Sequence, residues 1–303
     1  MRRESLSEEK RSADKDSTFW RKVLVFLDMI KFKHTIFALP FAYVGAFLAA
    51  KGLPSWKVCF WILLAMAGAR TVAMGVNRIV DLAFDAENPR TKDRPLVTGA
   101  IKRVEAWAMV VVATTVYFVA SYNLTPLAFK LSPLILAILV FYSYTKRFTY
   151  LCHLFLGLGI GMTPTAGWIA VQNSISPVPI LLSLGVMFWI AGFDVLYACQ
   201  DAEFDARRGL HSIPAKVGVE RAFRISTLFH IIAFAAFMAT GFVARLNWIY
   251  FLGMAATFVL LIFQRKVITP DDLSRMNIAF FRMNAAISII LFASTTFSLL
   301  LTA

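Results

Sequence analysis

The chain has 303 residues, of which 59% are hydrophobic and 16% are charged, and its mean hydropathy is +0.68. A water-soluble domain could not cover this much apolar material with polar surface, so the composition excludes that class and predicts an integral membrane protein. The net charge of +13 does not indicate a nucleic-acid partner, because the basic residues are spread over the ends of apolar runs rather than gathered in one domain.

Residues 1–20 carry mixed charge and lack the apolar core that a cleaved signal peptide requires. We expect a polar cytoplasmic tail there and a single domain over residues 21–303. The domain begins with an amphipathic stretch that contains Lys31 and Lys33, which predicts a helix lying at the membrane surface before the first span.

The apolar runs that follow have about the 20 residues that an α-helix needs to cross the membrane core, and no alternating pattern suggests a barrel. We therefore predict an all-α membrane protein, with nine transmembrane helices in one bundle around a central cavity open to the cytoplasm. The predicted spans, to within a few residues, are 34–50, 56–80, 104–122, 125–145, 151–172, 177–200, 221–243, 246–266 and 276–301.

Lysine and arginine residues predict the orientation of the bundle, because they accumulate in alternate connections. The rich connections, besides the N-terminus, are 90–103, 146–147, 207–224 and 265–275. These are expected to face the cytoplasm, which places the N-terminus on that side of a bacterial inner membrane.

The second predicted span ends in a polar motif, Asn77 to Gly99. On a helix, Asn77, Asp81 and Asp85 fall within one narrow sector, and Arg70 lies on the same face. This helix therefore presents four polar groups in one direction.

The sixth predicted span ends in a similar polar motif, and its two aspartates repeat the Asp-x3-Asp spacing of the first about 120 residues later. One face of that helix carries Asp194, Tyr197, Asp201, Asp205 and Arg208.

Carboxylates at a membrane boundary are costly unless a cation or a water-filled cavity accompanies them. Mg²⁺ is usually held by one or two carboxylates together with substrate phosphates, so two Asp-x3-Asp pairs predict Mg²⁺ and a diphosphate substrate. Nearby cations would bind the diphosphate oxygens, although each one also satisfies the positive-inside rule. These cations are Arg90, Lys92, Arg94, Lys146, Arg147, Arg207 and Arg208. The four histidines show no metal-ligand spacing.

Over residues 20–300 these motifs resemble the UbiA superfamily of intramembrane prenyltransferases. The resemblance rests on Asn77-x3-Asp81-x3-Asp85, Arg90-Thr91-x2-Arg94-Pro95-Leu96, the turn Tyr142 to Arg147, and Asp194-x2-Tyr197-x3-Asp201-x3-Asp205. The Asn-Pro-Arg-Thr and His-Ser-Ile-Pro runs are most similar to 4-hydroxybenzoate polyprenyltransferases. The resemblance implies Mg²⁺-dependent transfer of a polyprenyl group from its diphosphate to a ring carbon of 4-hydroxybenzoate, in ubiquinone precursor synthesis. Its partners would be polyprenyl diphosphate, an aromatic acid acceptor and membrane lipid.

The resemblance also implies roles for individual residues. Asn77, Asp81 and Asp85 match the first diphosphate–Mg²⁺ motif, Asp201 and Asp205 match the second, Asp194 and Tyr197 match supporting positions, and Arg70, Arg147 and its neighbour Lys146 match basic positions that contact the aromatic acid or the diphosphate. Two positions depart from the pattern. Arg78 stands where many members have Asp, and His211 where many have Lys, and both departures bear on the choice of acceptor.

Other functions fit part of the pattern. A secondary transporter also carries acids within its spans, but its sites lie at the membrane midplane in broken helices, whereas these acids lie at helix ends. Within the enzyme class, a dihydroxynaphthoate acceptor on a menaquinone route, or a different lipid product such as haem O, would use the same diphosphate site.

Overall fold

The computed structural model describes residues 20–31, 38–276 and 278–301. The predicted tail over residues 1–19, and Lys33 in the predicted surface helix, lie outside the described residues. Residues 20–29 are helical, with Phe26, Met29 and Ile30 buried and Trp20 exposed, so one face of this helix packs against the bundle.

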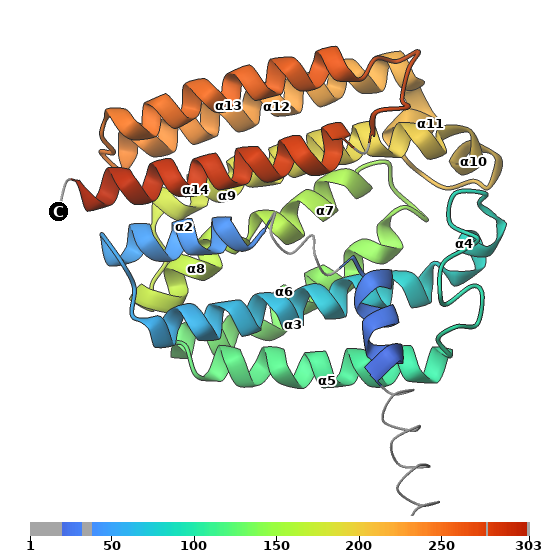
Figure 1. The fold of residues 1–303 in the computed structure, drawn as a ribbon, viewed down its shortest axis with the longest axis horizontal. Coiled ribbons are helices and arrows are strands. Elements are labelled where there is room, and N and C mark those ends of the chain that lie inside the picture. The colour runs from blue at the N-terminus through green and yellow to red at the C-terminus, as the bar shows by residue number, and fades with distance from the viewer. Residues whose placement is uncertain (1–19, 32–37, 277, 302–303) are drawn as a thin grey trace, which may run out of the picture.

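Eight of the described helices are long and apolar enough to cross a membrane (Figure 1). They are α3 (Trp56–Val80), α5 (Arg103–Tyr122), α6 (Pro126–Thr145), α7 (Cys152–Gly161) continued by α8 (Thr163–Gln172), α9 (Pro177–Ala198) with its extension, α12 (Val219–Val243), α13 (Trp248–Val267), and α14 (Asn284–Leu300) with the π-helical turn η3 (Ile278–Met283) at its start. The prediction of an all-helical membrane protein is therefore confirmed for eight of the nine spans.

The first predicted span is represented by the shorter helix α2 (Leu39–Ala50). Its 12 residues rise about 18 Å at 1.5 Å per residue, which falls short of the apolar core of a bilayer. Pro40 occupies the first turn, and Lys51 ends the helix in the left-handed conformation at φ 53°.

Helix α2 packs against α8 with backbone close to backbone. A Cβ atom added to Gly45 would lie 1.9 Å from the carbonyl oxygen of Pro164, and one added to Gly167 would lie 1.9 Å from that of Ala42. Small residues at a helix contact let two backbones approach in lipid, where packing rather than the hydrophobic effect drives association. These two glycines therefore set the spacing of α2 and α8.

The two helices that carry the aspartate motifs break in the same way. Helix α3 stops at Val80 and a six-residue helix, α4 (Leu82–Glu87), follows; α9 passes through the 3₁₀ turn η2 (Cys199–Asp201) into another six-residue helix, α10 (Ala202–Arg207). The residue at each break is the first aspartate of the motif. Asp81 has φ −88° and ψ 5°, and Asp201 has φ −109° and ψ 3°. The short helices and α11 (Ile213–Val217) lie at one end of the bundle, on the right in Figure 1, which we term the polar end.

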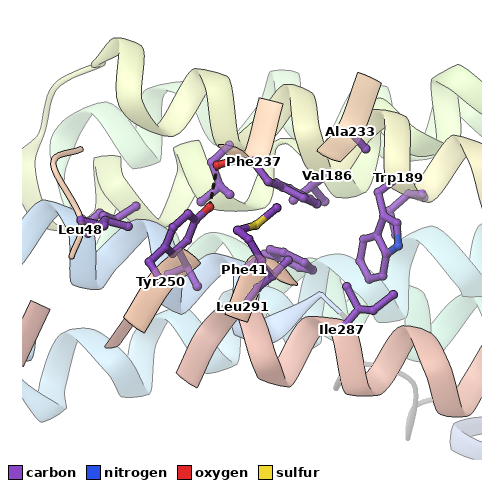
Figure 2. Close-up of a cluster of buried hydrophobic side chains, with 14 of the residues drawn as sticks. Phe41, Leu48, Val186, Trp189, Ala233, Phe237, Tyr250, Ile287 and Leu291 are labelled. Atoms are coloured by element: carbon purple, nitrogen blue, oxygen red, sulfur yellow. Dashed lines mark hydrogen bonds between the residues drawn. The ribbon is translucent and has the colours of Figure 1, made fainter. Parts of the chain in front are cut away.

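An aromatic cluster joins α2 to α9, α12, α13 and α14 (Figure 2). Phe41 meets the edge of Trp189 at a centroid distance of 5.3 Å and stacks on Phe237 at 6.2 Å. The buried Tyr250 hydroxyl donates to the Phe237 carbonyl at 2.7 Å, so its one polar atom is satisfied. The cluster fixes α2 against the C-terminal helices.

Replacing Gly45 by Ala is expected to lower the melting temperature in detergent, because the new methyl group forces α2 away from α8 at a cost of about 1–3 kcal/mol. The matched control is Gly52→Ala, since a Cβ there meets nothing within 4 Å. Equal melting temperatures for the two variants would contradict the close contact.

Candidate active site

The polar end brings both aspartate motifs together with cations from three connections. The first motif runs from the end of α3 through Asp81 into α4 and the loop after it, and the second runs from the end of α9 through η2 into α10. The turn after α6 supplies Lys146 and Arg147, and the chain before α11 closes over that turn, since the His211 amide donates to the Lys146 carbonyl at 2.6 Å.

Asp81 is the most heavily paired of the four carboxylates. It is 3% exposed and receives a hydrogen bond from Lys146 Nζ at 2.7 Å. Arg147 Nη2 donates to its other oxygen at 3.1 Å, and Asn77 Nδ2 donates to the first at 3.1 Å. Arg78 donates to Asn77 Oδ1 at 3.1 Å, which fixes the orientation of that amide. Arg78, which departs from the family pattern, therefore acts on Asp81 indirectly, by orienting Asn77.

Asp85 is buried on α4 and paired with Arg94 at 2.5 Å. The Thr91 hydroxyl donates to the Asp85 carbonyl at 3.0 Å, and the Arg90 amide donates to Asn88 Oδ1 at 2.9 Å. The Arg-Thr-x2-Arg run thus folds back over α4, and its two arginines point in different directions.

Arg90 crosses to the second motif. Its guanidinium binds both oxygens of Asp201, through Nε at 2.9 Å and through Nη2, while Asn88 Nδ2 donates to the same carboxylate at 3.0 Å. Arg90 Nη1 donates to the Tyr197 hydroxyl at 3.1 Å, and the guanidinium lies over the Tyr197 ring. Burial opposes the charged form of Arg90, but the hydrogen bond and the charge of Asp201 outweigh burial, so its pKa is raised above its ordinary value.

The two loops are also joined at their outer edge, where Arg208 pairs with Glu87. Asp205, by contrast, has no ion pair within the described residues and interacts with the side chain of Ser212. Arg208, expected to bind substrate, is thus an outer contact about half exposed.

Arg70 lies deeper, away from the paired carboxylates. It lines an apolar cavity of about 130 Å³ among α3, α5, α6, α7 and α8, together with Tyr142. Its Nη2 donates to the Lys31 carbonyl at 3.4 Å, and its Nε is buried with no hydrogen-bond partner. Among the predicted site residues, Arg70 is therefore the cation that faces the apolar interior.

Asp194 has a partner that the sequence did not reveal. Its carboxylate lies 2.6 Å from Nδ1 of His153 on α7, and Nε2 of that histidine accepts from the Ile213 amide at 3.2 Å. In the sequence His153 is a single histidine in an apolar run without metal-ligand spacing, and the partners lie 41 and 60 positions away.

The donors at the polar end fit Mg²⁺ bound mainly through a substrate. Carboxylate oxygens are the hard ligands this ion prefers. In the described part of the chain, however, no three His, Cys, Asp or Glu side chains gather closely enough to hold a metal alone. Two open carboxylate pairs with adjacent cations suit a metal that shares its ligands with phosphates.

Residues 38–286 match the model of the UbiA prenyltransferase family. The chain belongs to this family. The family assignment makes it an intramembrane prenyltransferase, so the transporter interpretation is wrong.

Curated relatives of the chain include 4-hydroxybenzoate octaprenyltransferases from several bacteria. The one from Alkalilimnicola ehrlichii is 30% identical over 225 residues, 74% of this chain and 76% of the relative. The one from Cupriavidus necator is 29% identical over 253 residues, 82% of this chain and 86% of the relative. The chain is thus similar to 4-hydroxybenzoate octaprenyltransferases over most of its length.

Solved structures share the fold. The apo structure of a UbiA homologue from Aeropyrum pernix K1 superposes with a TM-score of 0.79 at 37% identity, covering 86% of this chain and 96% of that one. A UbiA homologue from Archaeoglobus fulgidus bound to GPP and Mg²⁺ superposes with a TM-score of 0.69 at 19% identity, covering 90% and 99%. This second likeness supports the fold alone.

Changing Arg90 to Gln is expected to loosen both loops, because this arginine links Asn88's loop to Asp201 and Tyr197. Hydrogen–deuterium exchange should rise in residues 86–100 and in residues 199–210. Lys92→Gln is the control, since Lys92 is exposed on the same loop. An increase confined to residues 86–100 would show that Arg90 does not hold the second loop.

Proposed function

We propose that this enzyme transfers a polyprenyl group from polyprenyl diphosphate to a ring carbon of 4-hydroxybenzoate, with Mg²⁺, as a step toward ubiquinone. The observation that carries the proposal is the meeting of two Asp-x3-Asp motifs and their cations at one end of an apolar bundle. The curated relatives named 4-hydroxybenzoate octaprenyltransferase support the choice of acceptor. A dihydroxynaphthoate acceptor of the menaquinone route would use the same machinery.

The polar end would bind the diphosphate. In this proposal Asp81, Asp85, Asp201 and Asp205 hold Mg²⁺, largely through the diphosphate and water, with Asn77 and Tyr197 in support. The cations that bind the diphosphate oxygens are Arg90, Arg94, Lys146 and Arg147, with Arg208 at the outer edge.

Binding requires an exchange of partners. Arg94 is paired with Asp85, Lys146 with Asp81, and Arg90 with Asp201. A magnesium diphosphate brings both signs of charge, so each carboxylate can turn to the metal as its cation turns to a phosphate oxygen. The charges are thus brought together before substrate arrives, and no unpaired charge is left behind during exchange.

The chemistry follows from this arrangement. Mg²⁺, when bound, supplies Lewis-acid stabilisation of the diphosphate leaving group. The arginines and lysines add hydrogen bonds that strengthen as charge develops on the leaving oxygen. The apolar walls exclude water, so the allylic carbon, as its bond to the diphosphate oxygen breaks, meets the aromatic ring rather than a water molecule.

Arg70 is the cation we assign to the carboxylate of the acceptor. Arg147 already binds Asp81 and two backbone carbonyls, at Val80 and Ser143, whereas the buried Nε of Arg70 has no partner beside the apolar cavity. An aromatic acid has the matching shape, with one anionic group and an apolar ring.

We place the polar end on the cytoplasmic side, because the connections rich in lysine and arginine converge there. In this arrangement α2 supplies the ninth membrane segment, residues 21–303 form one domain around the cavity, and the enzyme resides in a bacterial inner membrane with its N-terminus in the cytoplasm.

The proposal is tested by incubating the purified, detergent-solubilised protein with a prenyl diphosphate and either 4-hydroxybenzoate or a dihydroxynaphthoate, with Mg²⁺ or with chelator. We expect Mg²⁺-dependent prenylation of 4-hydroxybenzoate. A preference for the naphthoate would keep the mechanism and change the acceptor, and turnover in chelator would contradict the role of the metal.

The same assay tests the carboxylates. Asp201→Asn should lower kcat by about 100-fold or more, since it removes a metal ligand and releases Arg90. Asp93→Asn, an exposed aspartate on the loop of the first motif, removes the same charge and should leave activity near wild type. Comparable losses in the two variants would contradict a specific role for Asp201.

Arg70→Gln should raise the KM for the aromatic acid by about 10- to 100-fold, the loss of a charged hydrogen bond, and leave the KM for the prenyl diphosphate unchanged. Arg147→Gln should show the reverse pattern. If Arg70→Gln instead raises the KM for prenyl diphosphate, Arg70 belongs to the diphosphate site.

A further inference from the structure

We propose that His153 is a positioning residue of the prenyl-transfer site, which acts as a neutral imidazole and orients the Asp194 carboxylate toward the aromatic acceptor. The inference rests on the proposed function and adds to it a residue from a helix, α7, that carries neither aspartate motif.

The imidazole of His153 holds two groups from different parts of the chain. Nδ1 lies 2.6 Å from Asp194 Oδ2 on α9, and Nε2 accepts from the backbone amide of Ile213, the first residue of α11, at 3.2 Å. His153 is 2% exposed, so it lies behind Asp194 and acts through that carboxylate rather than by touching substrate.

The Ile213 amide decides the protonation of the ring. A backbone N–H can only donate, so Nε2 must offer its lone pair and carry no proton. The Asp194 carboxylate accepts only, so the ring proton sits on Nδ1. An imidazolium would place two donors face to face at Ile213. The geometry thus selects the neutral Nδ1–H tautomer, with a short charge-assisted hydrogen bond to Asp194.

The depth of Asp194 indicates which substrate it faces. It precedes Asp201 by seven residues, about 10 Å along α9 at 1.5 Å per residue, and lies farther from the polar end. Its side chain is 23% exposed and interacts electrostatically with Tyr142, which lines the apolar cavity beside Arg70. Asp194 therefore lies deeper in the bundle than the carboxylates that would bind the diphosphate, on the side of Tyr142.

The hydrogen bond from the Ile213 amide to His153 Nε2 connects Asp194 to the second motif. Ile213 follows Ser212, whose hydroxyl caps α11 by accepting from the Ala215 amide at 3.4 Å and whose side chain interacts with Asp205. One imidazole thus sets both the carboxylate near the cavity and the start of α11, next to the loop that follows Asp205.

The test uses two substitutions that differ in hydrogen bonding. The amide of His153→Gln can donate to Asp194 and accept from Ile213, as the neutral imidazole does, whereas His153→Leu can do neither. We expect His153→Leu to raise the acceptor KM or lower kcat by about 10- to 100-fold, without raising the KM for prenyl diphosphate. His153→Gln should stay within about threefold of wild type.

His230→Leu is the control for removing a buried histidine, because His230 lies on α12 beside Arg265. It is expected to lower the melting temperature while keeping the acceptor KM. The assignment would be overturned if His153→Gln were as inactive as His153→Leu. It would also be overturned if His153→Leu changed only the KM for prenyl diphosphate.

A readout that needs no turnover separates this inference from the proposed function. Nitrogen NMR of ¹⁵N-histidine-labelled protein, with His153→Gln to assign the signal, should show a protonated Nδ1 and an unprotonated Nε2. An imidazolium, or the opposite tautomer, would overturn the inference even if prenyl transfer is found. Wild-type protein that transfers no prenyl group would refute the proposed function whatever the tautomer.

Discussion

The pairing of buried carboxylates with cations from other segments is the interaction on which the polar end depends. Asp81 and Asp85 are less than a tenth exposed, and an unpaired charge in such a place would cost several kcal/mol. The chain meets this cost with Lys146, Arg147 and Arg94, so the carboxylates hold their positions without substrate. A separate pair holds the two motifs together, because Arg90, on the loop after α4, binds Asp201 across 111 positions of sequence.

The break at the first aspartate of each motif explains how helix ends become a site. A continuous α3 would carry Asp85 onward along its axis. The change of conformation at Asp81 and at Asp201 instead starts a short helix at each place, while the Asp85 amide still bonds to the Asp81 carbonyl at 2.8 Å. Each motif thereby gains a loop arginine as a neighbour, Arg94 at Asp85 and Arg90 at Asp201.

Much of this could be predicted from the sequence, and the remainder has a physical reason. Hydropathy predicted nine spans, of which eight are confirmed, and helical periodicity predicted the face on which Asn77 contacts Asp81, since both depend on near neighbours in the chain. Periodicity says nothing about contacts between helices, so it could not show Arg90 crossing to Asp201. Nor could it separate His153 from an ordinary core histidine, because what distinguishes His153 is the position of Asp194 and Ile213.

A prenyltransferase site has two requirements that cannot be met at the same position. Diphosphate and metal need dense charge, whereas an allylic carbon about to meet an aromatic ring needs apolar walls without water. The chain separates them by depth along α3, with the paired carboxylates at the polar end and the apolar cavity further in. Arg70 lines the cavity, and Asp194 lies farther from the polar end than Asp201; the first binds the Lys31 carbonyl and the second binds His153. A charged group in such a site is useful only if its direction is fixed. The buried supports around it are therefore as much a part of the site as the groups that would touch substrate.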